Sequence, residues 1–206
     1  MPQKKNLYRT GRRMLLTTGV AALLLLLVLF TKAPALLQFP TANALGLTGL
    51  LLAALGAFGR VWSSMYIEGS KNKEIVDQGP YSVTRNPLYL FSFLGAIGLG
   101  LASCNPVVVL CLLAAFIFYY PGVIRKEERK LLRKHGGPFE EYLARVPRFV
   151  PKPSLFQQPE QITTSPGPVT SAFGDAVWFI LGYVLLRIVV WLHVFNLLPS
   201  LEIPFF

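Results

Sequence analysis

The chain has 206 residues, of which 53% are hydrophobic and 13% aromatic, and its mean hydropathy is positive. This composition is too apolar for an ordinary soluble domain. The net charge of +10 would suit nucleic-acid binding, but the lysines and arginines gather beside the ends of apolar segments, as in membrane proteins. We therefore expect an integral membrane protein that binds no nucleic acid.

Four apolar segments approach the roughly 20 residues that a helix needs to cross a bilayer: 14–30, 43–61, 87–101 and 105–124. Lys32-Ala-Pro follows the first segment, where a cleaved signal peptide would show small residues, so we expect this segment to be a true span. The link 103–106 is short and predicts an antiparallel hairpin between the third and fourth spans.

A fifth apolar segment, 173–198, is interrupted by Asp175, Arg187 and His193. An arginine in the middle of the bilayer costs about 2.5 to 3.5 kcal/mol when it faces lipid. We expect this segment to be a fifth transmembrane helix. The alternatives are a helix in the membrane interface, or one packed on the bundle with Arg187 facing a polar cavity.

The positive charges are distributed unevenly along the chain. Of the 20 lysines and arginines, 18 lie before the first span, in 60–85 or in 125–152, and only Lys32 and Arg187 lie elsewhere. If the spans alternate, these 18 lie on one side, which the positive-inside rule identifies as cytoplasmic. We expect a multi-pass protein of the bacterial inner membrane or the endoplasmic reticulum, with a cytoplasmic N-terminus and anionic lipid headgroups as counter-charges.

The cysteines and histidines do not indicate a metal centre. Cys104 and Cys111 have the spacing of neither a Cys-x-x-Cys pair nor a zinc ligand set, and the two histidines are far apart. We interpret the cysteines as small packing residues and expect no metal.

The first informative polar segment is 60–87. A Gly-Pro turn at 79–80 precedes Asn86-Pro87, which predicts a helix beginning at the proline. Arg85 and Asn86 then lie at a helix N-terminus, which favours an anion such as a carboxylate. Two rings suited to headgroup depth flank them, Tyr81 and Tyr89. A plain interfacial turn is the alternative.

The second informative segment is 125–151. It predicts that the fourth span continues beyond the membrane as a charged helix until Gly136-Gly137-Pro138. A short amphipathic helix should follow, because one face gathers the apolar side chains of Phe139, Tyr142, Leu143 and Val146. For Glu127 and Glu128 the alternative to a functional role is pairing with lysines and arginines on a solvated helix.

Together these segments form a specific pattern. Gly-Pro-Tyr-Ser-x-x-Arg-Asn-Pro-x-Tyr occupies 79–89, Glu-Glu follows at 127–128, a Gly-x-Phe-x-x-Tyr stretch lies within 137–142, and Arg-Val-Pro occupies 145–147. The pattern resembles the isoprenylcysteine carboxyl methyltransferase family and its phospholipid methyltransferase relatives. The resemblance covers about 60–151. The earlier spans match only as generic membrane helices, and the chain after about Phe156 has no counterpart.

The apolar segments predict an all-α polytopic membrane bundle of four core helices plus a fifth C-terminal helix. The resemblance implies a helical membrane protein with a cytoplasmic pocket for S-adenosylmethionine and a tunnel for a lipid or lipidated acceptor. Transferred by motif, the cofactor-binding residues are Tyr81, Arg85, Asn86, Pro87, Tyr89, Glu127, Glu128, Tyr142 and Arg145. Catalytic roles are predicted for Arg85, Arg145 and Glu128.

One departure concerns Asn86, because the family usually has a histidine there. An amide does not titrate, so this position supplies no general base. A carboxylate acceptor is ionised at neutral pH and needs only an arginine to orient it, for which Arg85, Arg145 and Arg60 are candidates. An amine acceptor, as in phospholipid N-methylation, needs a base such as Glu128 or water. The sequence leaves both open.

Two rival functions are an NADPH-dependent membrane sterol-type reductase, which shares a similar Arg-His-Pro-x-Tyr hairpin, and a non-enzymatic membrane scaffold. For the domain organisation we expect a core at 1–156 with its cofactor-binding part at 79–151, a linker at 157–172, and an apolar helix and tail at 173–206. We expect this last part to cover the acceptor tunnel or to support an oligomer.

Overall fold

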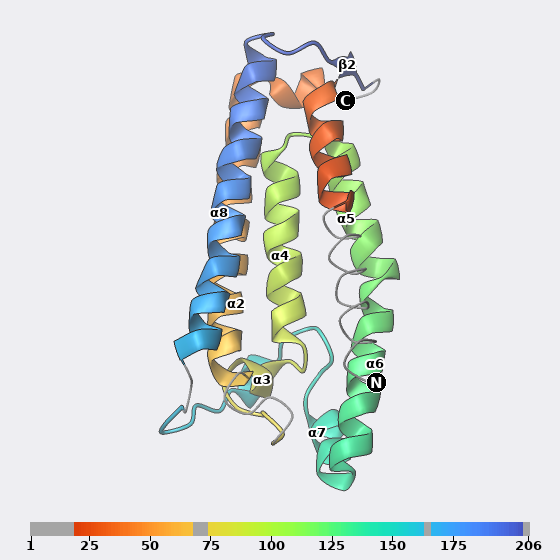
Figure 1. Cartoon of the computed structure of the whole chain (residues 1–206), viewed down its shortest axis with the longest axis vertical. Helices are drawn as coiled ribbons and strands as arrows, with labels where there is room; N and C mark the ends of the chain where they lie inside the picture. Colours follow the sequence, from red (N-terminus) through yellow and green to blue (C-terminus); the bar gives the residue numbers. More distant parts are fainter. Residues whose placement is uncertain (1–18, 68–73, 163–165, 204–206) are drawn as a thin grey trace, which may run out of the picture.

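The structure is a computed structural model that describes residues 19–67, 74–162 and 166–203 (Figure 1). Eight helices are present in these ranges: Gly19–Phe30, α2 Phe39–Ile67, α3 Pro80–Val83, α4 Pro87–Ala102, α5 Pro106–Phe118, α6 Tyr120–His135, α7 Gly137–Arg145 and α8 Pro166–Val194. The short elements are two 3-10 helices, η1 Pro34–Leu37 and η2 Pro153–Leu155, and two strands, β1 Thr31–Lys32 and β2 Leu201–Glu202. The beginning of the predicted first span, the cationic N-terminus and residues 68–73 lie outside the described residues.

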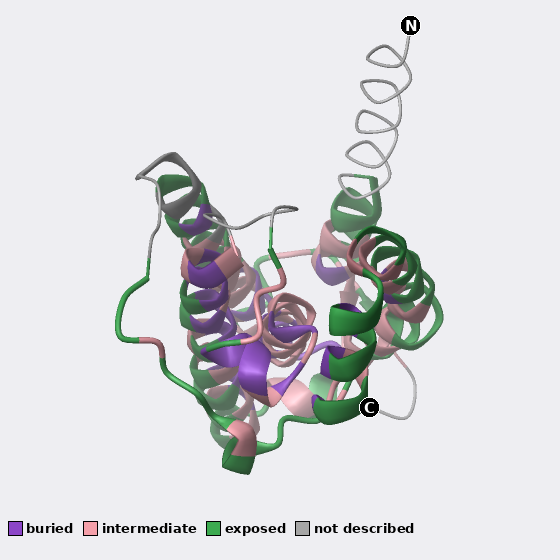
Figure 2. Ribbon diagram, turned by 90° about the horizontal axis from the view of Figure 1, so that it is seen from below, coloured by how far each residue is buried: buried purple, intermediate pink, exposed green. Residues whose placement is uncertain are grey.

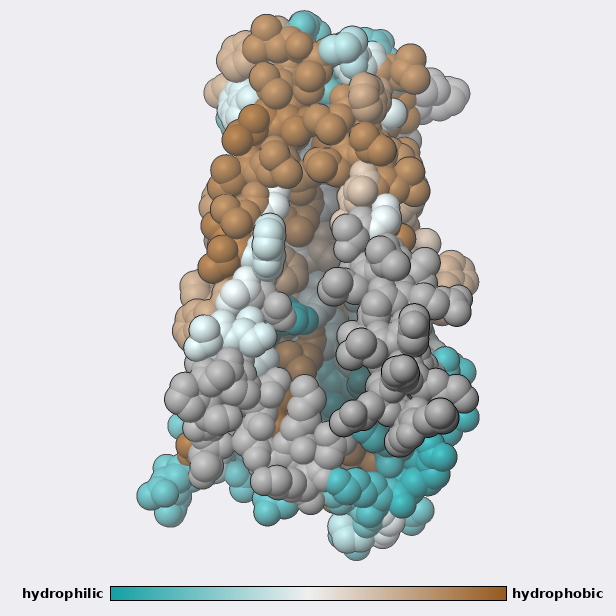
Figure 3. Space-filling view, viewed as in Figure 1, coloured by the Kyte–Doolittle hydropathy of each residue, from teal (hydrophilic) through white to brown (hydrophobic). Residues whose placement is uncertain are grey.

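The helices form an all-α membrane bundle, as predicted. Three are long and apolar enough to cross a bilayer: Phe39–Ile67, Pro106–His135 and Thr170–Val194. Two shorter apolar helices, Gly19–Phe30 and α4, stand beside them. Figure 3 shows the resulting apolar surface over the upper part of the molecule and hydrophilic side chains at the lower end.

The observed helix bounds differ from the expected ones at several ends. α2 begins before and ends after the predicted 43–61, and α8 begins at Pro166 instead of residue 173. The charged extension is confirmed, because α5 and α6 continue one another up to His135. Gly136, with a positive φ of 60°, then ends α6.

Helices α2 and α4 pack closely because small residues face each other. A Cβ atom added at Gly98 of α4 would lie 2.5 Å from the backbone nitrogen of Ala53 on α2. One added at Gly56 of α2 would lie 2.5 Å from the Cα of Gly95. Such small residues allow the backbones of membrane helices to touch. The α2–α4 pair is therefore the rigid centre that α8 covers.

Arg187 of α8 faces α2 rather than lipid, which explains how a charged residue fits in this apolar helix. Its Nη1 donates a hydrogen bond of 3.0 Å to the Ala42 carbonyl, and its guanidinium occupies the space above Gly46. The same group lies 5.8 Å from the ring centroid of Trp191. Thr170–Val194 is long and apolar enough to cross a bilayer, in agreement with the expected fifth span. Arg187 contacts the backbone of α2 instead of a polar cavity.

The end of the bundle at the top of Figure 1 is tied together by a polar cap that the sequence did not predict. Strands β1 and β2 pair in parallel, and Lys32 forms an ion pair of 3.4 Å with Glu202. Asn105 donates a 2.8 Å hydrogen bond to Thr31, while its side-chain oxygen caps the first turn of α5. The C-terminal segment is thereby fixed to the end of helix Gly19–Phe30.

We expect Gly98→Ala to destabilise the bundle by about 1 to 3 kcal/mol, because the added methyl group meets backbone that cannot move aside. Gly122→Ala in α6 is the matched control, since a methyl group added there would have no atom within 4 Å and alanine favours helix. Thermal unfolding of the purified protein in detergent measures both. Equal melting temperatures for the two variants would contradict the assigned α2–α4 contact.

Candidate active site

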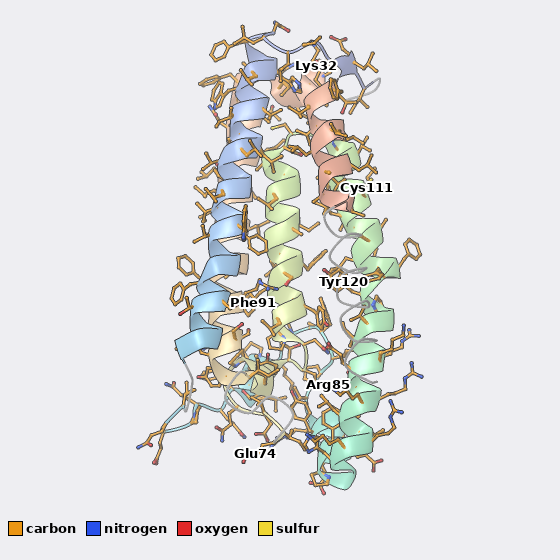
Figure 4. All side chains as sticks on the ribbon, in the orientation of Figure 1. Lys32, Glu74, Arg85, Phe91, Cys111 and Tyr120 are labelled. Atoms are coloured by element: carbon orange, nitrogen blue, oxygen red, sulfur yellow. The ribbon has the colours of Figure 1, made fainter. Side chains whose placement is uncertain are left out.

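A cavity of about 250 Å³ lies at the lower end of the bundle, between the start of α4, the helices α6 and α7, and the segment 74–76. Figure 4 shows Arg85 and Glu74 at this end and Tyr120 above them. Eight of the nine residues predicted to bind the cofactor line the cavity: Tyr81, Arg85, Asn86, Pro87, Tyr89, Glu127, Glu128 and Tyr142. Further lining comes from residues that the sequence pattern does not single out, among them Glu74, Ile75 and Lys130.

The ninth residue, Arg145, lies outside this cavity. It forms a 2.6 Å ion pair with Asp77, and both side chains are partly exposed. The two residues line a neighbouring hollow with Glu141. The pair joins α7 to the segment before α3. A direct role for Arg145 at the cofactor therefore stays a prediction.

Local backbone features bring Arg85 and Asn86 to the cavity. Gly79 precedes α3 with a φ of +57°, which an L side chain rarely adopts, and a Cβ there would meet the ring of Tyr66. Thr84 ends α3 in an extended conformation, and Pro87 begins α4. Thr84, Arg85 and Asn86 are the three residues between these helices. The predicted helix start at Pro87 is confirmed.

Residues 147–157, here called the strap, run beside 79–86 and fix it. Backbone hydrogen bonds of 2.9 Å join Arg85 to Pro147 and Lys152 to Val83. Asn86 donates a 2.9 Å side-chain hydrogen bond to the carbonyl of Arg148, also in the strap. The amide of Asn86 is buried and is used for positioning. Figure 2, seen from below, shows buried residues gathered at this end.

Glu128 is held between two arginines. Its Oε1 lies 3.4 Å from Arg85 Nη1, and its two oxygens accept hydrogen bonds of 3.2 and 2.6 Å from Nε and Nη2 of Arg148. The side chains of Glu128 and Arg85 are only 12% and 13% exposed, so this interaction is shielded from water. Arg85 Nε is buried and has no hydrogen-bond partner among the described residues, which leaves one charged donor for a ligand.

Arg148 is the functional candidate that sequence reasoning missed. Its bidentate contact with Glu128 is the geometry in which arginine binds carboxylates most strongly. The two residues are 20 positions apart and lie on different elements. The sequence offers one indication of Arg148, which is that it directly follows the Arg-Val-Pro motif at 145–147.

Tyr142 connects α7 to the cavity. Its hydroxyl donates a 2.9 Å hydrogen bond to the carbonyl of Tyr81, and its ring packs with Phe139 and Val146 in a buried cluster. Burial raises the pKa of Tyr142 above its usual range, and the nearby carboxylate of Asp77 adds to the rise. The phenol is therefore neutral at physiological pH and remains a hydrogen-bond donor. The predicted apolar face of α7 is confirmed.

The cavity has an unusual charge balance for this chain. Three of the ten Asp and Glu residues line it, Glu74, Glu127 and Glu128, although the whole protein carries a net charge of +10. The cations in its lining are Arg85 and Lys130. Tyrosine rings complete the wall. Among the described residues, no group of three His, Cys, Asp or Glu side chains is placed to hold a metal ion.

Comparison with known proteins gives one family and three relatives. The family model described as phospholipid methyltransferase matches residues 41–137, from the start of α2 to the end of α6. The nickel-cobalt-cadmium resistance protein NccN of Alcaligenes xylosoxydans xylosoxydans is 37% identical over 163 residues, which cover 76% of each chain. The cobalt-zinc-cadmium resistance protein CzcN of Cupriavidus metallidurans is 38% identical over 141 residues, 68% of this chain and 63% of CzcN.

The third relative is an enzyme, protein-S-isoprenylcysteine O-methyltransferase B of Arabidopsis thaliana. It is 26% identical over 125 residues, which cover 57% of this chain and 64% of the relative. No solved structure matches the chain. The chain thus belongs to the family of membrane methyltransferases that comprises the isoprenylcysteine carboxyl methyltransferases and their phospholipid methyltransferase relatives.

Proposed function

We propose that the protein transfers a methyl group from S-adenosylmethionine to a lipophilic acceptor in the membrane. The observation that carries this proposal is the carboxylate-rich, tyrosine-lined cavity at one end of the bundle. A sulfonium cofactor is cationic, so carboxylates and aromatic faces attract it. A phosphate-rich dinucleotide such as NADPH would need an excess of arginine and lysine, and the cavity has the opposite balance.

The reaction needs positioning more than acid or base chemistry. When bound, S-adenosylmethionine would supply an activated methyl group, because its sulfonium would leave as a neutral thioether that needs no proton. We assign Arg85, with its unused Nε, to a carboxylate of the cofactor or acceptor, and Glu127 and Glu128 to donors of the cofactor. Arg148 and the strap hold Glu128 and Asn86 in place, which limits the entropy lost on binding.

We propose a carboxylate acceptor in preference to an amine. At the centre of the site, Asn86 does not titrate, Glu128 is engaged by two arginines and Tyr142 is a neutral donor. The remaining carboxylates of the lining, Glu74 and Glu127, are exposed. A carboxylate needs no proton acceptor, whereas an amine does. The cation-rich lower end is assigned to the cytoplasmic side, where the cofactor is available.

We expect S-adenosylhomocysteine, and not NADPH, to raise the melting temperature of the purified protein. A ligand present at 100 times its dissociation constant adds about 2.7 kcal/mol to the free energy of unfolding. A shift with NADPH alone would favour a reductase. No shift with either compound would favour a scaffold.

We expect Arg85→Ala and Glu128→Gln each to weaken S-adenosylhomocysteine binding by about 1 to 3 kcal/mol, because each loses a shielded charged hydrogen bond. Glu160→Gln is the control, since Glu160 is exposed and lies outside the cavity lining. Titration calorimetry in detergent measures the affinities. Unchanged affinity in both cavity variants would place the cofactor elsewhere.

The variant Asn86→His distinguishes a carboxylate acceptor from an amine acceptor. An imidazole N–H can still donate to the Arg148 carbonyl, while its second nitrogen adds a base with a pKa of roughly 6.5. For a lipophilic carboxylate we expect a rate close to that of the wild type at all pH values. For a lipophilic amine we expect the variant to gain rate as pH rises through that pKa, because the deprotonated imidazole is the base. A wild-type protein that methylates the amine faster than the carboxylate would refute the carboxylate proposal.

The names of NccN and CzcN support a second proposal, that this methyl transfer contributes to tolerance of nickel, cobalt or cadmium. A strain that lacks the protein is complemented with wild type, Glu128→Gln or Glu160→Gln and grown with each metal. We expect wild type and Glu160→Gln to restore growth and Glu128→Gln to fail at equal protein level. Full restoration by Glu128→Gln would separate metal tolerance from methyl transfer.

A further inference from the structure

Helix α6 combines apolar side chains that face α7 with exposed cations over much of the rest of its surface. The inner half packs on α7 through Leu131 and Leu132 and presents Glu128 to the cavity. The helix also carries six lysines and arginines, of which Lys130 lines the cavity as well. All six are exposed: Arg125, Lys126, Arg129, Lys130, Arg133 and Lys134. Figure 4 shows nitrogen-tipped side chains extending from α6 away from the bundle.

This outer face of α6, defined by the six cations, is largely without counter-charges from the chain itself. Within the described ranges, no ion pair engages Arg125, Lys126, Arg129, Arg133 or Lys134. The acidic residues of the same helix, at positions 127 and 128, both line the cavity. These five cations are therefore available to an anionic partner from outside the protein.

The arginines of this face point back toward the membrane. Arg129 Nε donates to the Arg125 carbonyl at 3.2 Å, and Arg133 Nε donates to the Arg129 carbonyl at 3.3 Å. Each guanidinium thus lies about one turn nearer to α5 than its own Cα. This direction follows the normal tilt of helical side chains toward the N-terminus. Because α5 is the transmembrane part of the same helix, the charges concentrate at its boundary with the bilayer.

Helix length places that boundary at Arg125. At about 1.5 Å per residue, Arg125 lies about 28 Å along the continuous helix from Pro106, close to the roughly 30 Å thickness of the hydrocarbon core. Arg125 and Arg129 then lie at headgroup depth. Arg133 and Lys134 lie about 12 Å or more beyond Arg125 along the helix, farther from the membrane than Arg125 and Arg129.

We propose that Arg125 and Arg129, one turn apart on the outer face of α6, bind the phosphate of an anionic phospholipid from the adjoining leaflet. A guanidinium group can donate two parallel hydrogen bonds to a phosphate. Two arginines on successive turns of one helix can therefore bind the same headgroup phosphate. The site is distinct from the cavity and from the acceptor. Because Glu128 directly precedes Arg129 in α6, bound lipid also fixes the helix that closes the cavity.

The test measures lipid binding to the full-length protein in neutral detergent, with short-chain phosphatidylglycerol, short-chain phosphatidylcholine and glycerol phosphate as probes. We expect saturable binding of phosphatidylglycerol alone. Arg125→Gln with Arg129→Gln should weaken it about 30-fold, at roughly 1 kcal/mol for each charge near the surface. Arg133→Gln with Lys134→Gln removes the same charge farther from the membrane and should change it little.

Three outcomes would overturn the proposal. Equal losses in the two double variants would indicate nonspecific attraction by net charge, and a loss only in the distal pair would indicate a soluble partner. Glycerol phosphate binding as tightly as the lipid would assign the site to free phosphate. Melting temperatures without lipid show whether each variant is folded. Since neither variant touches the cavity, S-adenosylhomocysteine binding tests the proposed methyl transfer separately.

Discussion

The site depends on one interaction, the contact of Glu128 with Arg85 and Arg148. It joins three parts that are distant in sequence: α6, the turn before α4, and the strap. A carboxylate that is largely shielded from water is costly unless it is paired, so the two arginines offset the cost of burying Glu128, which is only 12% exposed. The strap adds hydrogen bonds from its backbone to Val83, Arg85 and Asn86. The cavity wall is therefore fixed before any ligand binds.

The membrane part supports this arrangement from above. Glycines on α2 and α4 bring two backbones into contact, so the start of α4 has a fixed position relative to the bundle. Arg187 anchors α8 to α2 through the Ala42 carbonyl. The two ends of the protein thus have different physical roles: hydrogen bonds and a two-residue strand pair close one end, and charge pairs shape the cavity at the other.

Much of this could be predicted from the sequence because its strongest signals are local. Hydropathy predicts the spans, Asn86-Pro87 predicts the start of α4, and the apolar spacing from Phe139 predicts α7. The cavity lining followed from motif resemblance, since no periodicity links residue 85 to residue 128. Arg148 was missed because its partner lies 20 residues away on another element. The partner of Arg187 and the pairing of β1 with β2 were also missed, because both depend on how distant segments pack.

Asn86 shows how a different residue at a motif position can keep a structural role. Its side chain is buried, donates to the strap and lines the cavity. An asparagine fulfils the hydrogen-bonding part of that position and removes only the ability to titrate. A sulfonium donor already carries an activated leaving group, so a site can lose a base and keep its reaction if its nucleophile arrives ionised. Under the proposed methyl transfer, an asparagine at position 86 suits acceptors that are anionic at neutral pH, and we propose that this position helps to determine the acceptor class.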